Sequence, residues 1–201
     1  MKHGISYSRL MLEKISNITN ELEIRGIRSV VLNDLAISLY GIIKPVDEIR
    51  ILVEGKELDT IAYVVAKELG MSIYQRDIYN SLRTLGKAVI NPVLIPLTIL
   101  EITRSPIDTG ILVNRIRFTY KELYIYVPQI EYLICKLLTY NAYPYNIYAY
   151  ALMIVHKEII DRGVIKRLLK DTNIDLDKIM ENISRIKSII ELFPELSNEN
   201  T

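Results

Sequence analysis

Apolar residues recur at helical spacing near the start of the chain and at strand-like spacing soon after it. Met11, Ile15, Ile18 and Leu22 form one apolar stripe, which predicts a helix over residues 8–23. Short β-branched or alternating runs then indicate strands that alternate with helices. The predicted strands cover residues 29–32, 48–53, 71–74, 87–91, 93–103, 115–120 and 123–127, and the predicted helices between them cover residues 35–40, 57–69, 77–82 and 106–113.

The spacing changes at Pro128, after which only helical patterns recur. A helix is predicted from residue 130, and further helices cover residues 145–161, 164–170 and 176–193. The sequence therefore predicts an α/β (α+β) core over residues 1–128, with a mixed sheet flanked by helices. Residues 129–201 form a helical C-terminal subdomain that we expect to pack on this core.

Composition narrows the classes of function. The chain has 201 residues, of which 25 are basic and 24 acidic, so its net charge of +1 argues against binding to nucleic acid or to anionic membranes by net charge. The single Cys135 excludes an internal disulfide framework and a cysteine-based zinc cluster. We expect a cytoplasmic protein, because no secretory leader and no run of about 18 apolar residues is present. The high isoleucine content suggests an AT-rich genome and a warm habitat.

One segment carries a family resemblance. Residues 31–53 read VLNDLAISLYGIIKPVDEIRILV. This segment resembles the opening of the minimal nucleotidyltransferase superfamily, in the branch found in toxin–antitoxin and abortive-infection proteins. That family has a strand, a Gly-Gly pair, a helix ending in glycine, a basic-Pro turn and a strand with Asp-x-Asp. Gly41, Lys44, Pro45 and the strand Ile49 to Val53 match this pattern in type and spacing.

Three later stretches are similar to the same family in the expected order. The stretch YIYVPQIEYLICKLL at residues 124–138 is similar to the junction before the helical part, with Glu131 and Lys136 in place. The stretches SPID at residues 105–108 and YPYNI at residues 143–147 also lie at family positions. The resemblance thus covers most of the chain and implies a nucleotidyltransferase-like fold.

The positions that carry the family's chemistry are altered. The family holds divalent metal with two carboxylates on one strand face and a third on a neighbouring strand, because hard cations need anionic oxygen ligands. The first two positions correspond here to Glu48 and Arg50, and the third falls near Thr98. Arg50 cannot bind a cation, because a guanidinium has no acceptor. Strand alternation from Thr98 predicts that Glu101 lies on the opposite face.

The family's phosphate-binding turn is altered as well. Its Gly-Gly pair lets backbone N–H groups approach a triphosphate. Asn33 and Asp34 occupy that position here, and we expect them to cap the following helix and to oppose a phosphate. In the helical part, Tyr143 and Asn146 replace the Arg and Asp of the family, while Lys136 is retained as a substrate-binding position.

Three interpretations of these changes remain. In the first, the fold is retained without transferase chemistry, Arg50 pairs with Glu48 in place of a metal, and no cofactor is expected. In the second, a transferase that acts on a protein or RNA hydroxyl survives with shifted ligands at Asp47, Glu48 and Glu54, and requires Mg²⁺ and a nucleoside triphosphate. In the third, an unrelated α/β domain mimics the pattern.

Tyrosines crowd the helical part, in the stretch TYNAYPYNIYAY. Packing of these rings against the sheet is the simplest explanation, and Tyr143, Tyr145 and Tyr148 are the candidates for a contact with a protein partner or a second copy. Base stacking ranks last, because the stretch has no Lys or Arg. The sequence thus favours a non-catalytic binding or regulatory module, antitoxin-like or defence-associated. An active nucleotidyltransferase and a nucleic-acid-binding protein are the alternatives.

Overall fold

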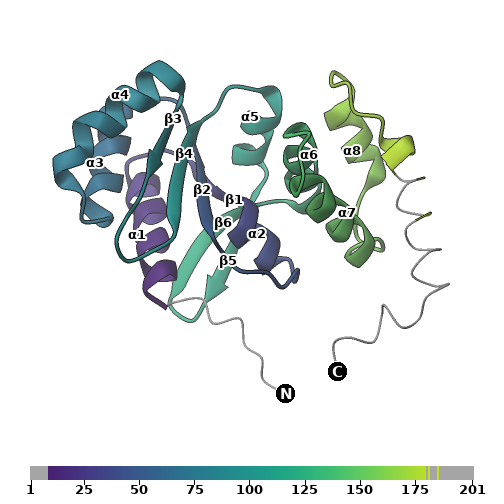
Figure 1. Cartoon of the computed structure of the whole chain (residues 1–201), viewed down its shortest axis with the longest axis horizontal. Coiled ribbons are helices and arrows are strands. Elements are labelled where there is room, and N and C mark those ends of the chain that lie inside the picture. Colours follow the sequence, from purple (N-terminus) through teal and green to yellow (C-terminus); the bar gives the residue numbers. More distant parts are fainter. Residues whose placement is uncertain (1–8, 180, 182–184, 186–201) are drawn as a thin grey trace. The chain divides into compact units, whose positions relative to one another are not determined.

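A mixed four-stranded sheet organises the N-terminal part of the computed structural model, which describes residues 9–179, 181 and 185 (Figure 1). The strand order is β1-β2-β4-β3, with β2 and β4 parallel and the two outer pairs antiparallel. A separate hairpin of β5 and β6 contacts β1 and α1. The strands are β1 (Ser29–Leu32), β2 (Glu48–Val53), β3 (Lys87–Ile90), β4 (Leu97–Ile102), β5 (Arg115–Tyr120) and β6 (Leu123–Pro128).

Helices cover the two faces of the sheet unequally (Figure 1). One face is buried beneath α1, α3 and α4, apart from the half-buried Ile102 at the end of β4. The other face carries Val30, Leu32 and Leu52, which α5 covers with Ile107 and Ile111. The remainder of this second face, along β2, β4 and β3, is only partly buried. The helices are α1 (Arg9–Ile24), α2 (Asn33–Leu39), α3 (Leu58–Glu68), η1 (Ser72–Tyr74), α4 (Gln75–Leu85), α5 (Pro106–Val113), α6 (Ile130–Thr139), α7 (Tyr145–Val155) and α8 (Arg162–Leu169).

The chain divides into two compact units, Met1–Leu133 and Ile134–Thr201. The second unit holds most of α6 together with α7 and α8. Asp161 begins α8 by accepting hydrogen bonds from the backbone N–H groups of Gly163 and Val164, at 2.7 and 3.2 Å. Packing of the helical part on the core stays a prediction.

Most elements form where the hydrophobic pattern places them, and the differences have local causes. Residues 71–74 contain a 3₁₀ turn instead of a strand. The strand predicted over residues 93–103 begins only at Leu97, because Pro96 has no N–H to donate to the ladder. The helix predicted over residues 145–161 ends at Val155. Asp175 caps the last predicted helix at its start, and most of residues 176–193 lie outside the described residues.

The capping role predicted for Asn33 and Asp34 is wrong. The helix α2 includes both residues, Leu32 is its N-cap, and no side chain caps it. Gly41 has a φ of +90° just beyond the end of α2, as a left-handed residue at a helix end requires. Among the described residues, no helix has the length and apolar character needed to cross a bilayer.

Candidate functional site

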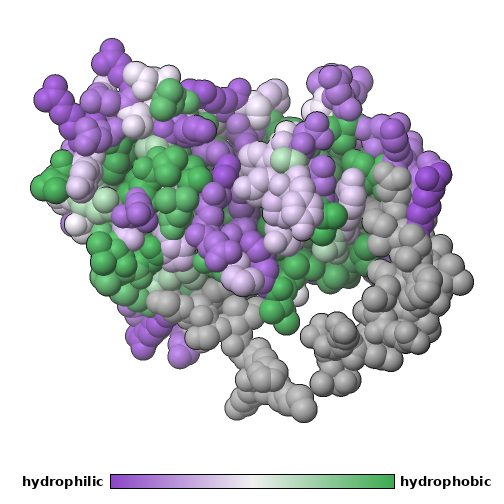
Figure 2. All heavy atoms as spheres, viewed as in Figure 1, coloured by the Kyte–Doolittle hydropathy of each residue, from purple (hydrophilic) through white to green (hydrophobic). Residues whose placement is uncertain are grey.

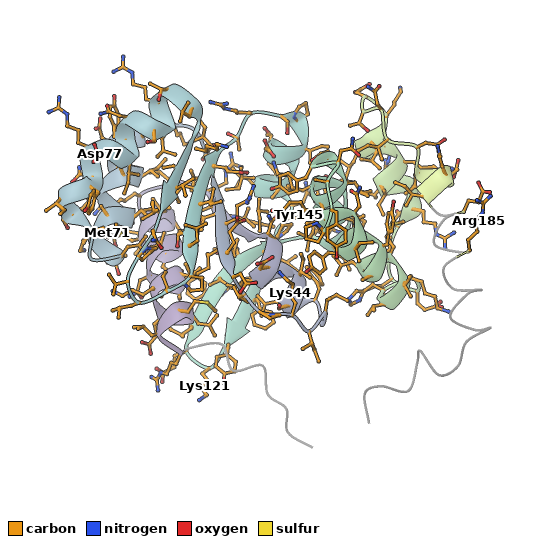
Figure 3. The ribbon with its side chains drawn as sticks, in the orientation of Figure 1. Lys44, Met71, Asp77, Lys121, Tyr145 and Arg185 are labelled. Atoms are coloured by element: carbon orange, nitrogen blue, oxygen red, sulfur yellow. The ribbon has the colours of Figure 1, made fainter. Side chains whose placement is uncertain are left out.

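Asp34 holds the segment that leads from α2 into β2. Its Oδ2 accepts hydrogen bonds from the backbone N–H groups of Asp47, at 3.3 Å, and Glu48, at 3.2 Å. Its other oxygen forms an ion pair with Lys44, which lies on the segment after α2 (Figure 3). Because Asp34 holds the first residue of β2, it fixes the start of the strand that carries Glu48 and Arg50.

Asn33 adopts a conformation that glycine favours. Its φ is +51°, in the left-handed region that asparagine tolerates better than most residues. Its side chain is fully buried, and neither of its polar atoms has a hydrogen-bond partner among the described residues. A buried asparagine side chain therefore occupies the turn at which β1 leads into α2.

Arg50 lies at the centre of a cluster on the partly buried face of the sheet. Its Nε donates to Glu48 Oε1 at 2.9 Å, and its Nη1 donates to Glu101 Oε1 at 2.7 Å. The Arg50 side chain is only 12% exposed, so its charge depends on these carboxylates instead of water. The Arg50–Glu48 ion pair expected from the sequence is therefore present, and Glu101 adds a second one from β4.

The register of β2 and β4 reverses the expected positions of Thr98 and Glu101. Thr98 pairs with Ile49, is fully buried, and donates to the carbonyl oxygen of Pro96 at 3.2 Å. It therefore faces away from Arg50. Glu101 pairs with Leu52 and lies on the same face as Arg50. The strand contains apolar residues on both faces, so its sequence alone did not reveal which face is buried.

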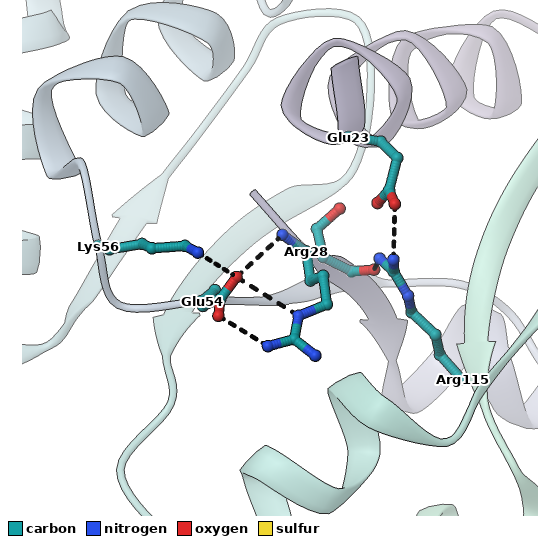
Figure 4. A network of polar contacts seen from close by, with 6 residues as sticks. Glu23, Arg28, Glu54, Lys56 and Arg115 are labelled. Carbon is teal, nitrogen blue, oxygen red and sulfur yellow. Dashed lines mark hydrogen bonds and ion pairs between the residues drawn. The ribbon is translucent and has the colours of Figure 1, made fainter. Parts of the chain in front are cut away.

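The shifted ligand set also fails to assemble. Glu54 follows the far end of β2, six residues from Glu48, which corresponds to about 20 Å of strand. It is held there by Arg28, whose Nη2 is 2.8 Å from Glu54 Oε1, and by Lys56 at 3.2 Å (Figure 4). Hydrogen bonds from Arg28 lower the pKa of Glu54 to about 2. Glu54 is thus part of an ion-pair network at the opposite end of the strand.

A second ion pair lies beside the first, because Arg115 binds the carbonyl oxygen of the residue that follows Arg28. Arg115 Nη2 is 2.7 Å from Glu23 Oε1, and Arg115 Nη1 donates to the carbonyl oxygen of Ser29 at 3.1 Å (Figure 4). The guanidinium also lies 4.2 Å from the centre of the Tyr126 ring. These contacts join α1, β1 and the hairpin, which indicates a structural role for this end of the sheet.

The donor set does not fit a divalent cation. Glu48 and Glu101 are the two carboxylates on the relevant face, and the guanidinium of Arg50 is bound to both. A cation between them would face a fixed positive charge at close range. Across the described part of the chain, no group of three or more His, Cys, Asp or Glu residues is placed to hold a metal.

Glu131, which the sequence resemblance singles out, lies in the first unit. Glu131 is almost fully buried. Nearby, the Tyr40 hydroxyl donates to the carbonyl oxygen of Pro128 at 2.6 Å, which connects the end of α2 to the end of the hairpin. Burial, together with the negative charge of Glu131, raises the pKa of Tyr40 well above its usual value.

The remaining candidates belong to the second unit. The Lys136 ammonium lies 5.4 Å from the centre of the Tyr140 ring, which is itself 4.6 Å from the ring of Tyr145. Tyr143 is 85% exposed, while Tyr145 and Tyr148 are half-buried. Tyr143 therefore offers more free ring surface than the other two candidates for a protein contact.

Among known proteins, this chain is similar to solved structures. No protein-family model and no curated protein sequence matches it. An antigenic nucleotidyltransferase-like protein from Paracoccidioides brasiliensis has a similar structure, with a TM-score of 0.50, 10% sequence identity, and coverage of 94% of this chain and 91% of that one. The antibiotic-resistance factor ANT(2'')-Ia is also similar, with a TM-score of 0.48, 13% identity, and coverage of 92% and 97%. The chain therefore has a nucleotidyltransferase-like fold.

Proposed function

We propose that this chain is a nucleotidyltransferase-fold protein without transferase activity, which acts as a binding or regulatory module. The observation that carries the proposal is Arg50, which forms ion pairs with Glu48 and Glu101 on the face where the resembled family binds its metal. A guanidinium supplies the positive charge permanently, whereas a metal would bind and leave with its nucleotide. No cofactor is expected.

The changed phosphate-binding turn supports the same proposal. Asp34 uses its carboxylate to hold the start of β2 and to pair with Lys44, whereas the family presents only backbone N–H groups at this position. A triphosphate would have to compete with this carboxylate for Lys44 and for the backbone N–H groups that Asp34 binds. We further propose that the module contacts a protein partner through Tyr143, Tyr145 and Tyr148, as an antitoxin-like or defence-associated component would.

Calorimetric titration of the full chain with ATP, GTP, CTP and UTP, each with Mg²⁺ or Mn²⁺, tests the proposal. We expect no metal-dependent binding at micromolar nucleotide. Metal-dependent micromolar binding would overturn it.

A charge-reversal variant makes the test sharper. Arg50→Asp places three carboxylates on one sheet face, so Mn²⁺ should raise its melting temperature while leaving the unmodified chain unchanged. Arg25→Asp is the matched control, because Arg25 pairs with Glu21 on the surface of α1 and its replacement brings only two exposed carboxylates together. An equal effect of Mn²⁺ on both variants would contradict the assignment of Arg50.

One observation favours a second candidate, an active metal-dependent nucleotidyltransferase. Glu48 and Glu101 still present carboxylates from neighbouring strands on one face. This candidate predicts transfer of labelled nucleotide to a protein or RNA hydroxyl, and loss of that transfer in Glu48→Ala. Labelling no higher than in the Glu48→Ala control would reject it.

A further inference from the structure

The outer edge of β3 carries backbone groups that the sheet does not use. β3 ends the strand order, with β4 as its neighbour on one side. Ile102 N donates to Gly86 O, so hydrogen-bonding pairs along this ladder fall on Gly86, Ala88 and Ile90. The N–H and C=O groups of Lys87 and Val89 therefore point outward from the sheet.

An exposed apolar side chain marks this edge. Val89 is 60% exposed, and the exposed Lys87 is the one charged residue of β3. Hydrophobic side chains also gather over the part of the molecule where β3 and β4 lie (Figure 2). The exposed large apolar residues between positions 73 and 94 are Ile73, Tyr74, Leu85, Val89, Val93 and Leu94.

A groove runs beside the same edge. It has a volume of about 320 Å³ and lies between β3 and the segment formed by η1 and α4. Met71, Tyr74 and Ile78 line one side, and Val89 and Asn91 line the other. Met71 and Asp77 mark the helical wall at this margin (Figure 3). The edge thus combines unpaired backbone groups with an apolar hollow.

We propose that this edge is the interface between two copies of the chain, which pair through antiparallel β3 strands. A two-fold axis at Val89 places Val89 opposite its own copy and Lys87 opposite Asn91 of the second chain. The register buries apolar surface at its centre and keeps the two Lys87 charges apart. An isologous contact of this kind closes after two copies, so it does not lead to fibres.

The groove beside β3 offers apolar surface that a second copy would cover. Tyr74 and Val89 both line it and are 47% and 60% exposed, so the two-fold register brings two such surfaces together. The net charge of +1 adds little repulsion between copies.

Sedimentation velocity of the full chain over a range of concentrations tests the proposal. We expect a species of twice the 23.2 kDa chain mass. Val89→Lys should weaken the dimer at least tenfold, because it places two ammonium groups opposite each other at the axis. Its circular dichroism spectrum should stay unchanged, since Val89 is exposed and its replacement leaves the fold of each chain intact. Ile116→Lys is the matched control, because Ile116 is an exposed residue of the edge strand β5, and its dimer should persist.

A cross-link tests the register. In a hydrogen-bonded antiparallel pair the two Val89 Cα atoms would lie about 5.5 Å apart, a separation that a disulfide spans. Val89→Cys should therefore give a covalent dimer under mild oxidation, and Val93→Cys, exposed beyond the strand, should not. A chain that stays monomeric at every concentration would overturn the proposal. A dimer that Val89→Lys leaves intact, or that Tyr143→Ala dissociates, would also overturn it.

Discussion

Glu101 binds Arg50 across two neighbouring strands, 51 positions apart in the sequence, at 2.7 Å between Oε1 and Nη1. Arg50 also binds Glu48, two residues away on its own strand. One guanidinium therefore connects β2 with β4 on the sheet face that α5 covers only in part. The cluster stabilises the parallel pair of β2 and β4.

Removal of the guanidinium should destabilise the fold. We expect Arg50→Met to lower the free energy of unfolding by about 2 kcal/mol, because two partly buried carboxylates lose their charged hydrogen bonds and repel each other. Urea unfolding measures this loss. Arg25→Met removes an exposed pair and should cost less than about 0.5 kcal/mol. The double variant Arg50→Met with Glu101→Gln should lose less free energy of unfolding than the two single variants lose together. If the two losses simply add, Arg50 and Glu101 are not coupled.

The sequence was sufficient to predict the fold class and the order of the elements, apart from the strand expected over residues 71–74. Strand β1 begins and ends where its β-branched run placed it, and strand β2 where alternation of polar and apolar residues placed it. It was also sufficient to predict the Arg50–Glu48 pair, since residues two apart on a strand share a face. Both features depend on short-range periodicity alone.

The position of Glu101 depends on long-range register. Thr98 and Glu101 lie on opposite faces of β4, as alternation requires, but the sequence did not determine which face meets Arg50. Asp34 was a suitable cap by residue type, yet it binds the start of β2, 13 and 14 positions further along the chain. Both contacts exist only after the strands have paired, so a local pattern does not contain them.

Acid should remove the contribution of Glu54. Its folded-state pKa of about 2 lies below the ordinary value of 4.5, so the unfolded chain takes up the proton first as the pH falls. Glu54→Gln should therefore be less stable than the unmodified chain by about 1 kcal/mol at pH 7, a modest loss because Arg28 is partly exposed. This difference should shrink as the pH falls from about 4.5 towards 2. Urea midpoints at each pH measure it, and a constant difference would contradict the network in Figure 4.

Tyr40 should resist ionisation while the protein is folded. Its pKa is raised, so the neutral phenol is favoured in the folded state and the contribution to stability is lost only as the pH rises above the usual value near 10. Absorbance at 295 nm follows tyrosine ionisation. At pH 10, the absorbance at 295 nm of the unmodified chain should equal that of Tyr40→Phe, apart from changes common to both. The two absorbances should differ only when alkali unfolds the protein. The same comparison in concentrated urea is the control, because in the unfolded chain the phenol of Tyr40 has its usual pKa near 10.

Gly110 should tolerate no side chain. A Cβ at this position of α5 would lie 2.5 Å from Cε1 of Tyr132. The ring cannot move freely, because Asn114 Nδ2 donates to the Tyr132 hydroxyl at 2.9 Å. We therefore expect Gly110→Ala to lower the free energy of unfolding by about 1–2 kcal/mol, since overpacking exceeds the gain in helix propensity.

Gly55→Ala is the matched control for Gly110→Ala, because its Cβ would meet Ile102 and Thr103 at ordinary contact distances of 3.5 Å and more. Its unfolding free energy should change by less than about 0.5 kcal/mol. Tyr132→Leu should recover part of the loss in the Gly110→Ala background, because the smaller side chain leaves room for the new methyl group. If Gly110→Ala is as stable as the unmodified chain in urea, the close approach of α5 to Tyr132 is not what requires glycine there.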